Sequence, residues 1–234
     1  AGAKTDILII RNLTPQAIQE TMAEMEKRIA RAQIVMLPGG FSGGDEPEGS
    51  GKFIAAAFHN PAVAEQVRIL LKQRDGLILG ICNGFQALVK SGILPGNDVL
   101  TETRTATLTY NHENHFECRW VSSKPVSQKC IWTQGLTEII DCPVAHGEGN
   151  FTLSNLHIAK TLMDNDQLAL TYVHHDGSPA CGIYPINPNG SVMDVAGICN
   201  PQGNVLGLMP HPEDHIFPFQ SPDRVHRKGA SGLP

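Results

Sequence analysis

Short apolar runs alternate with helical patterns in the first part of the chain, and this alternation leaves few possible folds. The runs are Asp6–Ile10, Ile34–Leu37 and Gly76–Ile81. Thr14–Pro15 and Asn60–Pro61 each predict a helix start, because Thr and Asn cap helices and Pro suits the first turn. Apolar strands that alternate with helices are typical of a parallel sheet with helices on both faces.

The second half of the chain is richer in strands than in helices. A hairpin signal at Pro201–Gly203 separates two of these strands and predicts an antiparallel pair. Together the patterns predict one α/β domain over residues 1–234, in which the second half is partly antiparallel. The predicted strands of this half are 105–110, 116–123, 139–146, 167–173, 195–200 and 204–209.

Composition excludes several classes of function. The net charge is −5, so the chain lacks the basic excess that nucleic-acid binding requires. No apolar run has the length of a membrane span, so no membrane partner is expected. The 6 cysteines contain no C-x-x-C pair, which favours a reduced, cytoplasmic compartment over a disulfide framework.

A cysteine between two glycines marks the most informative turn. Gly80-Ile-Cys82-Asn-Gly84 joins a predicted strand to a predicted helix. Flanking glycines permit the tight turn that exposes a nucleophile, and the helix N-terminus lowers the pKa of a thiol placed there. The alternative is a small buried cysteine with no chemical role, and the two glycines favour the nucleophile.

A thiol nucleophile requires a base, and His211 is the best of the 10 histidines. It follows an apolar strand and lies between two prolines, which hold its side chain rigidly. Glu213 can accept a hydrogen bond from the second ring nitrogen and orient the imidazole. Cys82, His211 and Glu213 are therefore the candidate catalytic residues.

Five strings of sequence together resemble the class I glutamine amidotransferases, and within them the glutaminase components of phosphoribosylformylglycinamidine synthases. The resemblance covers nearly the whole chain and implies a flavodoxin-like, three-layer α/β fold. The strings are Pro38–Asp45 (PGGFSGGD), Leu79–Gln86 (LGICNGFQ), Phe116–Trp120 (FECRW), Ala145–Gly149 (AHGEG) and Met209–Glu213 (MPHPE).

The resemblance implies a role for each matched residue. Cys82 would attack the amide of L-glutamine, His211 would transfer protons, and Glu213 would orient His211. Backbone N–H groups near Gly40 and at Asn83 would bind the oxyanion. The implied substrate-binding residues are Gly39, Gly40, Phe41, Asn83, Gln86 and His146.

The resemblance also implies a partner. Ammonia would pass to a synthetase domain or subunit, which would use ATP and Mg²⁺ to convert formylglycinamide ribonucleotide to formylglycinamidine ribonucleotide in purine biosynthesis. This chain itself is expected to hold no cofactor. The Gly49–Lys52 stretch lacks a complete phosphate loop, because position 46 is Glu and position 53 is Phe.

No metal site is expected either. His112, His115 and Cys118 have no fourth ligand at a usual spacing, so we interpret them as a strand surface.

Two segments of the family fold have no counterpart in the sequence. The family begins with a strand and a helix ahead of anything that matches Asp6–Ile10, and it ends with a helix beyond Pro234. We therefore interpret the chain as a fragment of a longer one. The missing strand would lie between Asp6–Ile10 and Ile34–Leu37.

Two other functions remain open from the sequence. One is a stand-alone cysteine hydrolase of the same fold, such as a γ-glutamyl hydrolase or a peptidase. The other is a non-catalytic module that resembles an amidotransferase, although the intact Cys82, His211 and Glu213 argue against it.

Overall fold

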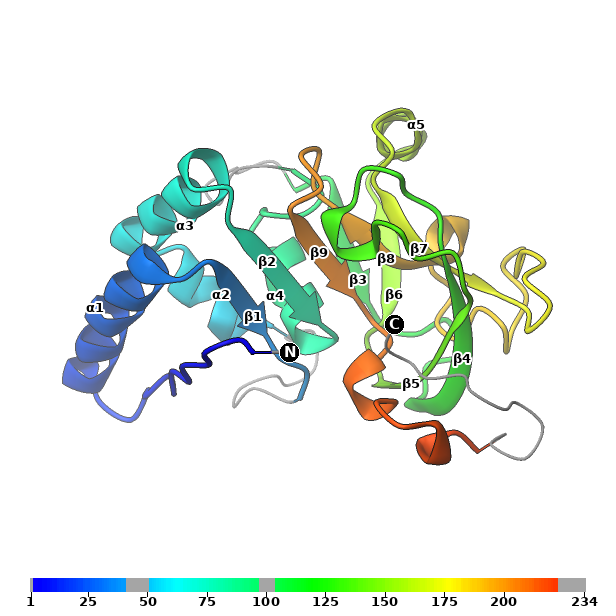
Figure 1. Cartoon of the computed structure of the whole chain (residues 1–234), viewed down its shortest axis with the longest axis horizontal. Helices are drawn as coiled ribbons and strands as arrows, with labels where there is room; N and C mark the ends of the chain where they lie inside the picture. Colours follow the sequence, from blue (N-terminus) through cyan, green and yellow to red (C-terminus); the bar gives the residue numbers. More distant parts are fainter. Residues whose placement is uncertain (1, 41–50, 97–103, 223–234) are drawn as a thin grey trace.

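The computed structural model describes residues 2–40, 51–96 and 104–222. Its main element is a 7-stranded sheet with the order β1-β2-β9-β8-β7-β4-β5, beside a 2-stranded sheet of β3 and β6 (Figure 1). The strands are β1 (Ile34–Leu37), β2 (Leu77–Ile81), β3 (Ala106–Thr109), β4 (Glu117–Pro125), β5 (Ile140–His146), β6 (Asn150–Leu153), β7 (Leu168–Val173), β8 (Val195–Cys199) and β9 (Val205–Leu208).

The helices begin where the sequence predicts for α1 and α3. The hydroxyl of Thr14 accepts a hydrogen bond from the N–H of Ala17 at 3.1 Å, and the Asn60 side chain caps α3 in the same way. Two helices, α2 and α5, have no counterpart among the predictions. The α-helices are α1 (Pro15–Arg31), α2 (Lys52–Phe58), α3 (Pro61–Gln73), α4 (Asn83–Lys90) and α5 (Leu156–Asp164), and short 3₁₀ helices are η1 (Ile131–Thr133), η2 (Val192–Asp194), η3 (Pro212–Asp214) and η4 (Pro218–Gln220).

The sheet changes from parallel to antiparallel between β9 and β8. β1, β2 and β9 run parallel, whereas β8 and β9 form the antiparallel hairpin predicted from Pro201–Gly203. β7, β4 and β5 continue the sheet with antiparallel pairs. The predicted mixed sheet with a strand-rich second half is therefore confirmed.

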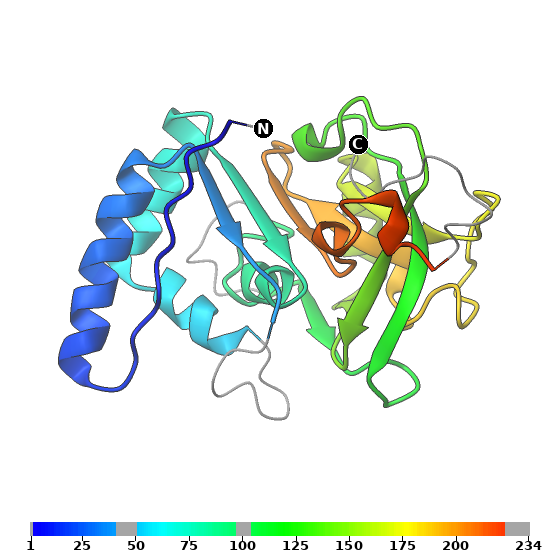
Figure 2. The same ribbon diagram turned by 60° about the horizontal axis from the view of Figure 1, so that its bottom comes forward.

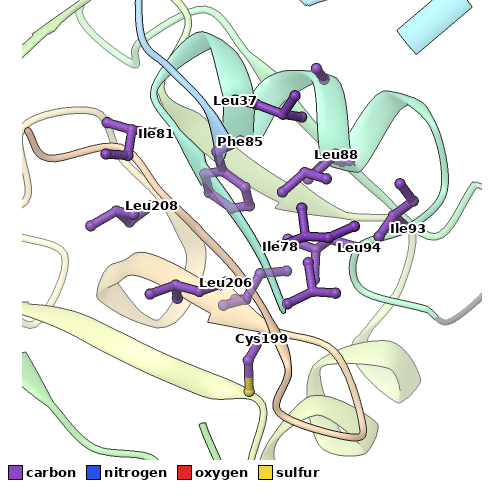
Figure 3. Close-up of a cluster of buried hydrophobic side chains, with 14 of the residues drawn as sticks. Leu37, Ile78, Ile81, Phe85, Leu88, Ile93, Leu94, Cys199, Leu206 and Leu208 are labelled. Carbon is purple, nitrogen blue, oxygen red and sulfur yellow. The ribbon is translucent and has the colours of Figure 1, made fainter. Parts of the chain in front are cut away.

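One face of the parallel strands packs against α4. Phe85 and Leu88 of α4 lie over Ile78 and its neighbours in the core (Figure 3). Glycines let the helix approach the sheet closely: a Cβ at Gly207 would lie 2.1 Å from the Phe85 ring, and one at Gly80 would lie 2.6 Å from Leu88. This packing fixes the junction between β2 and α4, where Cys82 lies.

The prediction of a buried strand at Asp6–Ile10 is wrong. This segment has no strand pairing, and Ile7 and Ile9 are 82% and 76% exposed. It runs along α1 instead (Figure 2), where Asp6 accepts a hydrogen bond from Arg28 at 2.7 Å. Although β1 has a free edge, the segment does not pair with it, so its apolar alternation alone does not make it a strand.

The prediction that β1 is a fully buried strand is also wrong. β1 lies at the edge of the sheet and pairs only with β2. Ile34 stands beside Leu77, and Met36 beside Leu79, so these four side chains share one face. Ile34 and Met36 are 52% and 49% exposed. Among the described residues this face therefore lacks a complete covering layer.

This open apolar edge predicts self-association of the isolated chain. An uncovered edge strand with exposed Ile and Met side chains is a template for pairing with another copy. Met36→Lys is expected to reduce association in sedimentation or light-scattering measurements. The matched control is Leu156→Lys. Leu156 is 86% exposed, and it lies on α5 and not on an edge strand. Equal association of both variants and the unmodified chain would contradict the prediction.

Candidate active site

Cys82 occupies a strained turn at the end of β2. Its backbone angles are φ 51° and ψ −105°, a region that side-chain-bearing residues rarely adopt. The flanking glycines are required sterically: a Cβ at Gly84 would lie 2.1 Å from the carbonyl oxygen of Leu37, and one at Gly80 would lie 2.7 Å from Gly84. The predicted strand–turn–helix around the cysteine is therefore confirmed.

His211 reaches the same place from the end of β9. Ile81 and Leu208 are paired neighbours in the sheet, so the carboxyl ends of β2 and β9 lie side by side (Figure 1). The N–H of His211 donates to the carbonyl of Pro143 at 2.8 Å, which ties the loop to β5. The Nδ1 atom of His211 lies 2.8 Å from Oε1 of Glu213, and because a carboxylate only accepts, Nδ1 carries the proton.

Gly39 shows how closely the nucleophile and the histidine approach each other. A Cβ added at Gly39 would lie 2.6 Å from Cε1 of His211 and 3.4 Å from Cβ of Cys82. Both side chains thus pack against one glycine. The Nε2 atom of His211 is buried and makes no hydrogen bond of ordinary geometry among the described residues, so it is free to serve the thiol or a substrate.

The charges of this site favour a protonated histidine. Burial lowers the pKa of His211, but the nearby Cys82 sulfur and the Glu213 carboxylate raise it, and the net pKa is about 10. His211 therefore holds its proton at neutral pH beside the sulfur of Cys82. A protonated imidazole beside a cysteine sulfur is an arrangement found at cysteine nucleophiles.

The structure places the predicted oxyanion residues next to each other. The side-chain amide of Asn83 donates to the carbonyl oxygen of Gly40 at 2.9 Å. Gly40 has φ +118° and open space where a Cβ would be, so only glycine adopts this conformation without strain. Phe41, the remaining member of this predicted set, lies outside the described residues.

Gln86 and His146 are connected to the nucleophile through the loop that follows β5. The amide nitrogen of Gln86 donates to the carbonyl of Glu148 at 2.7 Å. The Cys82 thiol lies 3.8 Å from the carbonyl oxygen of Ala145, the residue before His146. The loop 145–149 therefore joins both the nucleophile and Gln86, and the structure brings together every described residue that the sequence predicts for the site.

His146 is neutral in this setting. Its side chain is 2% exposed. Burial lowers the pKa of His146, the charge of His211 lowers it further, and the resulting pKa is about 4. Two histidines of one site thus hold different charges at neutral pH: His211 is protonated and His146 is not.

Sequence reasoning missed Asn111, which lies beside His146. The side chain of Asn111 is 1% exposed, and it hydrogen-bonds to the loop that follows β5. No sequence motif identifies an asparagine whose role depends on tertiary contacts. The signal that could have drawn attention to Asn111 is its position shortly before the Phe116–Trp120 string in the sequence.

The interpretation of His112, His115 and Cys118 as a strand surface is wrong for the two histidines, which lie in the turn before β4. His115 lies 2.6 Å from Oε1 of Glu117, and Cys118 is exposed on β4. Within residues 2–40, 51–96 and 104–222, no group of three potential ligands could hold a metal ion. No helix in the same part of the chain has the length and apolarity needed to cross a membrane.

Comparison with known sequences gives one family. A profile of the CobB/CobQ-like glutamine amidotransferase domain matches residues 1–232. The phosphoribosylformylglycinamidine synthase subunit PurQ of Treponema denticola is 42% identical over 228 residues, which cover 92% of this chain and 80% of that protein. PurQ of Methanococcus maripaludis is 40% identical over 230 residues, which cover 97% of this chain and 79% of that protein.

A solved structure agrees with the sequence relatives. The structure of PurLQS from Thermotoga maritima contains a chain with 28% sequence identity and a TM-score of 0.57, and the match covers 82% of this chain and 74% of that one. These comparisons confirm both the resemblance drawn from the sequence motifs and the predicted fold class.

Proposed function

The chain belongs to the CobB/CobQ-like glutamine amidotransferase family, and on this basis we propose that it hydrolyses L-glutamine through Cys82, His211 and Glu213. The observation that carries the proposal is the convergence of Cys82 and His211 on Gly39, with Glu213 bound to the far nitrogen of the imidazole. The strained backbone of Cys82 supports it, because such strain concentrates at functional sites.

The chemistry proceeds in two halves. The Cys82 sulfur attacks the side-chain amide carbon of glutamine, and the carbonyl electrons move to oxygen. When this intermediate collapses, His211 donates its proton to the nitrogen, ammonia leaves and a γ-glutamyl thioester remains. Neutral His211 then takes a proton from water, the hydroxide attacks the thioester, and glutamate and the Cys82 sulfur are released.

The remaining residues bind the substrate and stabilise the oxyanion. Backbone N–H groups at Gly40 and Asn83 would donate to the oxygen as its negative charge develops, and the contact of the Asn83 amide with the Gly40 carbonyl supports this pairing. Gly39, Phe41, Gln86 and His146 complete the glutamine pocket in this proposal. No cofactor takes part in these steps.

The names of the relatives support a proposal for the destination of the ammonia. The curated relatives are named as subunits of phosphoribosylformylglycinamidine synthase, and the Thermotoga maritima structure is of PurLQS. We infer that ammonia from this chain passes to a synthetase domain or subunit, which uses ATP and Mg²⁺ to convert formylglycinamide ribonucleotide to formylglycinamidine ribonucleotide. This purine-biosynthetic assembly is expected to be cytoplasmic.

Side-by-side synthesis assays test the proposal. In the complex of the chain with its synthetase, Cys82→Ala is expected to abolish product formation from glutamine and to leave product formation from ammonium salt intact. Cys181→Ala, at a second free cysteine that is exposed, is the matched control and is expected to keep both activities.

Each other outcome rejects part of the account. Loss of both activities in Cys82→Ala would assign the cysteine to structure or to synthesis. Survival of both would remove it from the mechanism, as expected for a non-catalytic module. Full glutamine turnover by the chain without a synthetase would favour a stand-alone hydrolase.

A further inference from the structure

Asn111 makes an unusually complete set of hydrogen bonds beside the proposed active site. It lies just beyond β3, and its N–H donates to the carbonyl of Gly147 at 2.9 Å. Its side-chain nitrogen donates to the carbonyls of His115 and His146 at 2.9 and 2.8 Å. Its side-chain oxygen lies 2.9 Å from the N–H of Gly149 and 3.1 Å from Nδ1 of His146.

These contacts determine the tautomer of His146. The orientation of the Asn111 side-chain amide follows from its partners. The atom that faces two carbonyl oxygens must be the nitrogen, and the atom that faces a backbone N–H must be the oxygen. The oxygen faces Nδ1 of His146 and can only accept, so Nδ1 of the imidazole carries the proton. Nε2 is consequently the unprotonated nitrogen, with its lone pair available.

The His146 ring is also fixed in position. A Cβ at Gly149 would lie 2.3 Å from Cε1 and 2.7 Å from Nε2 of the ring, so the imidazole packs directly on the glycine. Nε2 is buried and has no hydrogen-bond partner among the described residues. A buried acceptor without a partner is costly in the resting protein, and this cost is removed when a donor binds.

The same loop connects His146 to the reacting groups. The carbonyl before His146 lies 3.8 Å from the Cys82 sulfur, and the carbonyl of Glu148 holds the Gln86 amide. The charge of His211 also reaches the His146 ring. On the proposed function, the hydrogen-bond donors that glutamine would bring to this loop are its amide N–H groups, and then ammonia.

We propose that Asn111 is a positioning residue of the glutaminase reaction, which holds His146 in its Nδ1–H tautomer so that Nε2 accepts a hydrogen bond from the amide nitrogen of bound glutamine. This inference rests on the proposed function. It adds a residue that acts through His146 and not through contact with substrate. An acceptor at the amide nitrogen orients the leaving group away from the oxyanion donors.

A double-mutant cycle tests whether Asn111 acts through His146. In the synthetase complex, Asn111→Ala is expected to lower kcat/KM for glutamine about tenfold or more. In a His146→Ala background the same change is expected to have less than about a twofold effect, because the residue that it positions is already absent. Equal effects in both backgrounds would overturn the proposal, since a merely structural asparagine would act independently of His146.

A pair of substitutions at His146 tests the acceptor without touching Asn111. A Gln side chain at position 146 places its amide where Nε2 of the imidazole lies. The shorter side chain of Asn places its amide only where Nδ1 lies. His146→Gln is therefore expected to retain at least about tenfold more glutamine-driven activity than His146→Asn. Equal activities of the two variants would exclude an acceptor role for Nε2.

Two controls distinguish failure of the Asn111 proposal from general destabilisation and from failure of the proposed function. Asn204 is a buried asparagine with several hydrogen bonds at the opposite end of β9, and Asn204→Ala is expected to leave kcat/KM for glutamine within about twofold. Loss of activity in that variant equal to that of Asn111→Ala would attribute the effect to general destabilisation. Cys82→Ala in the same assay tests the proposed function itself, and its outcome does not depend on Asn111.

Discussion

His211→Ala is expected to lower glutamine-driven synthesis by about 10⁴-fold or more and to leave ammonia-driven synthesis intact. Triads act as a unit, and loss of the proton-transferring member removes most of their catalysis. His146 is a poor substitute, because its protonated nitrogen faces Asn111 and its pKa is about 4. The measurement is product formation with glutamine and with ammonium salt in the synthetase complex.

Glu213→Gln separates the orienting role from the proton-transferring one. Its loss of activity is expected to be at least about tenfold smaller than that of His211→Ala, because the imidazole remains. Glu213 contributes to the raised pKa of His211, which is about 10. Activity that needs the imidazolium is present below this pH and lost as pH rises through it, so Glu213→Gln is expected to move the alkaline limb to lower pH. A larger loss at Glu213 than at His211 would mean that the roles are reversed.

Gly39→Ala is expected to lower glutamine-driven synthesis by about 10²-fold through a steric effect. The new Cβ would lie 2.6 Å from the His211 ring and 3.4 Å from Cβ of Cys82, so the histidine must move. A displacement of about 1 Å at a reacting group can cost about 10²-fold in rate. Synthesis from ammonia is expected to survive, since it bypasses this site.

Other glycines provide the comparison for Gly39. Gly40→Ala meets no atom within 4 Å but strains a residue at φ +118°, and it is expected to weaken the glutamine reaction by disturbing the oxyanion donor. Gly135 has φ +82° and open space as well, away from the proposed site, so Gly135→Ala measures backbone strain alone. Activity of Gly39→Ala equal to that of Gly135→Ala would contradict the steric explanation.

The sequence predicts the chemical centre of this protein better than its periphery. The spacing of Gly80, Cys82 and Gly84 imposes a strand–turn–helix by steric exclusion alone, and the backbone has this form. The prolines beside His211 likewise fix where the histidine leaves its strand. Motifs of this kind carry their own geometry, which is why residues distant in sequence could be assigned to one site.

The errors arise where a segment depends on neighbours. Asp6–Ile10 has the alternation of a strand, but a strand must also pair with a neighbour, and this segment lies along α1 and not on the free edge of β1. The burial of Ile34 and Met36 was misjudged for the same reason, because hydrophobicity does not reveal whether a covering layer exists.

Asn111 is unrecognisable in sequence for a related reason. Apart from His115, its partners lie at the end of β5 and in the loop after it; His146 and Gly149 are 35 and 38 residues away along the chain. A single polar residue between strands usually indicates a turn, and only the folded structure shows that this one is buried.

The central claim is that the Cys82 thiol is the nucleophile, and brief labelling with a glutamine-like electrophile, such as a diazo-ketone analogue, tests it most directly. Peptide mapping after a short reaction near neutral pH would identify the modified cysteine. The account predicts that label accumulates on Cys82, although it is buried and the thiols of Cys118 and Cys181 are exposed, because Cys82 lies beside the protonated His211. Dominant label on Cys118 or Cys181 would contradict it.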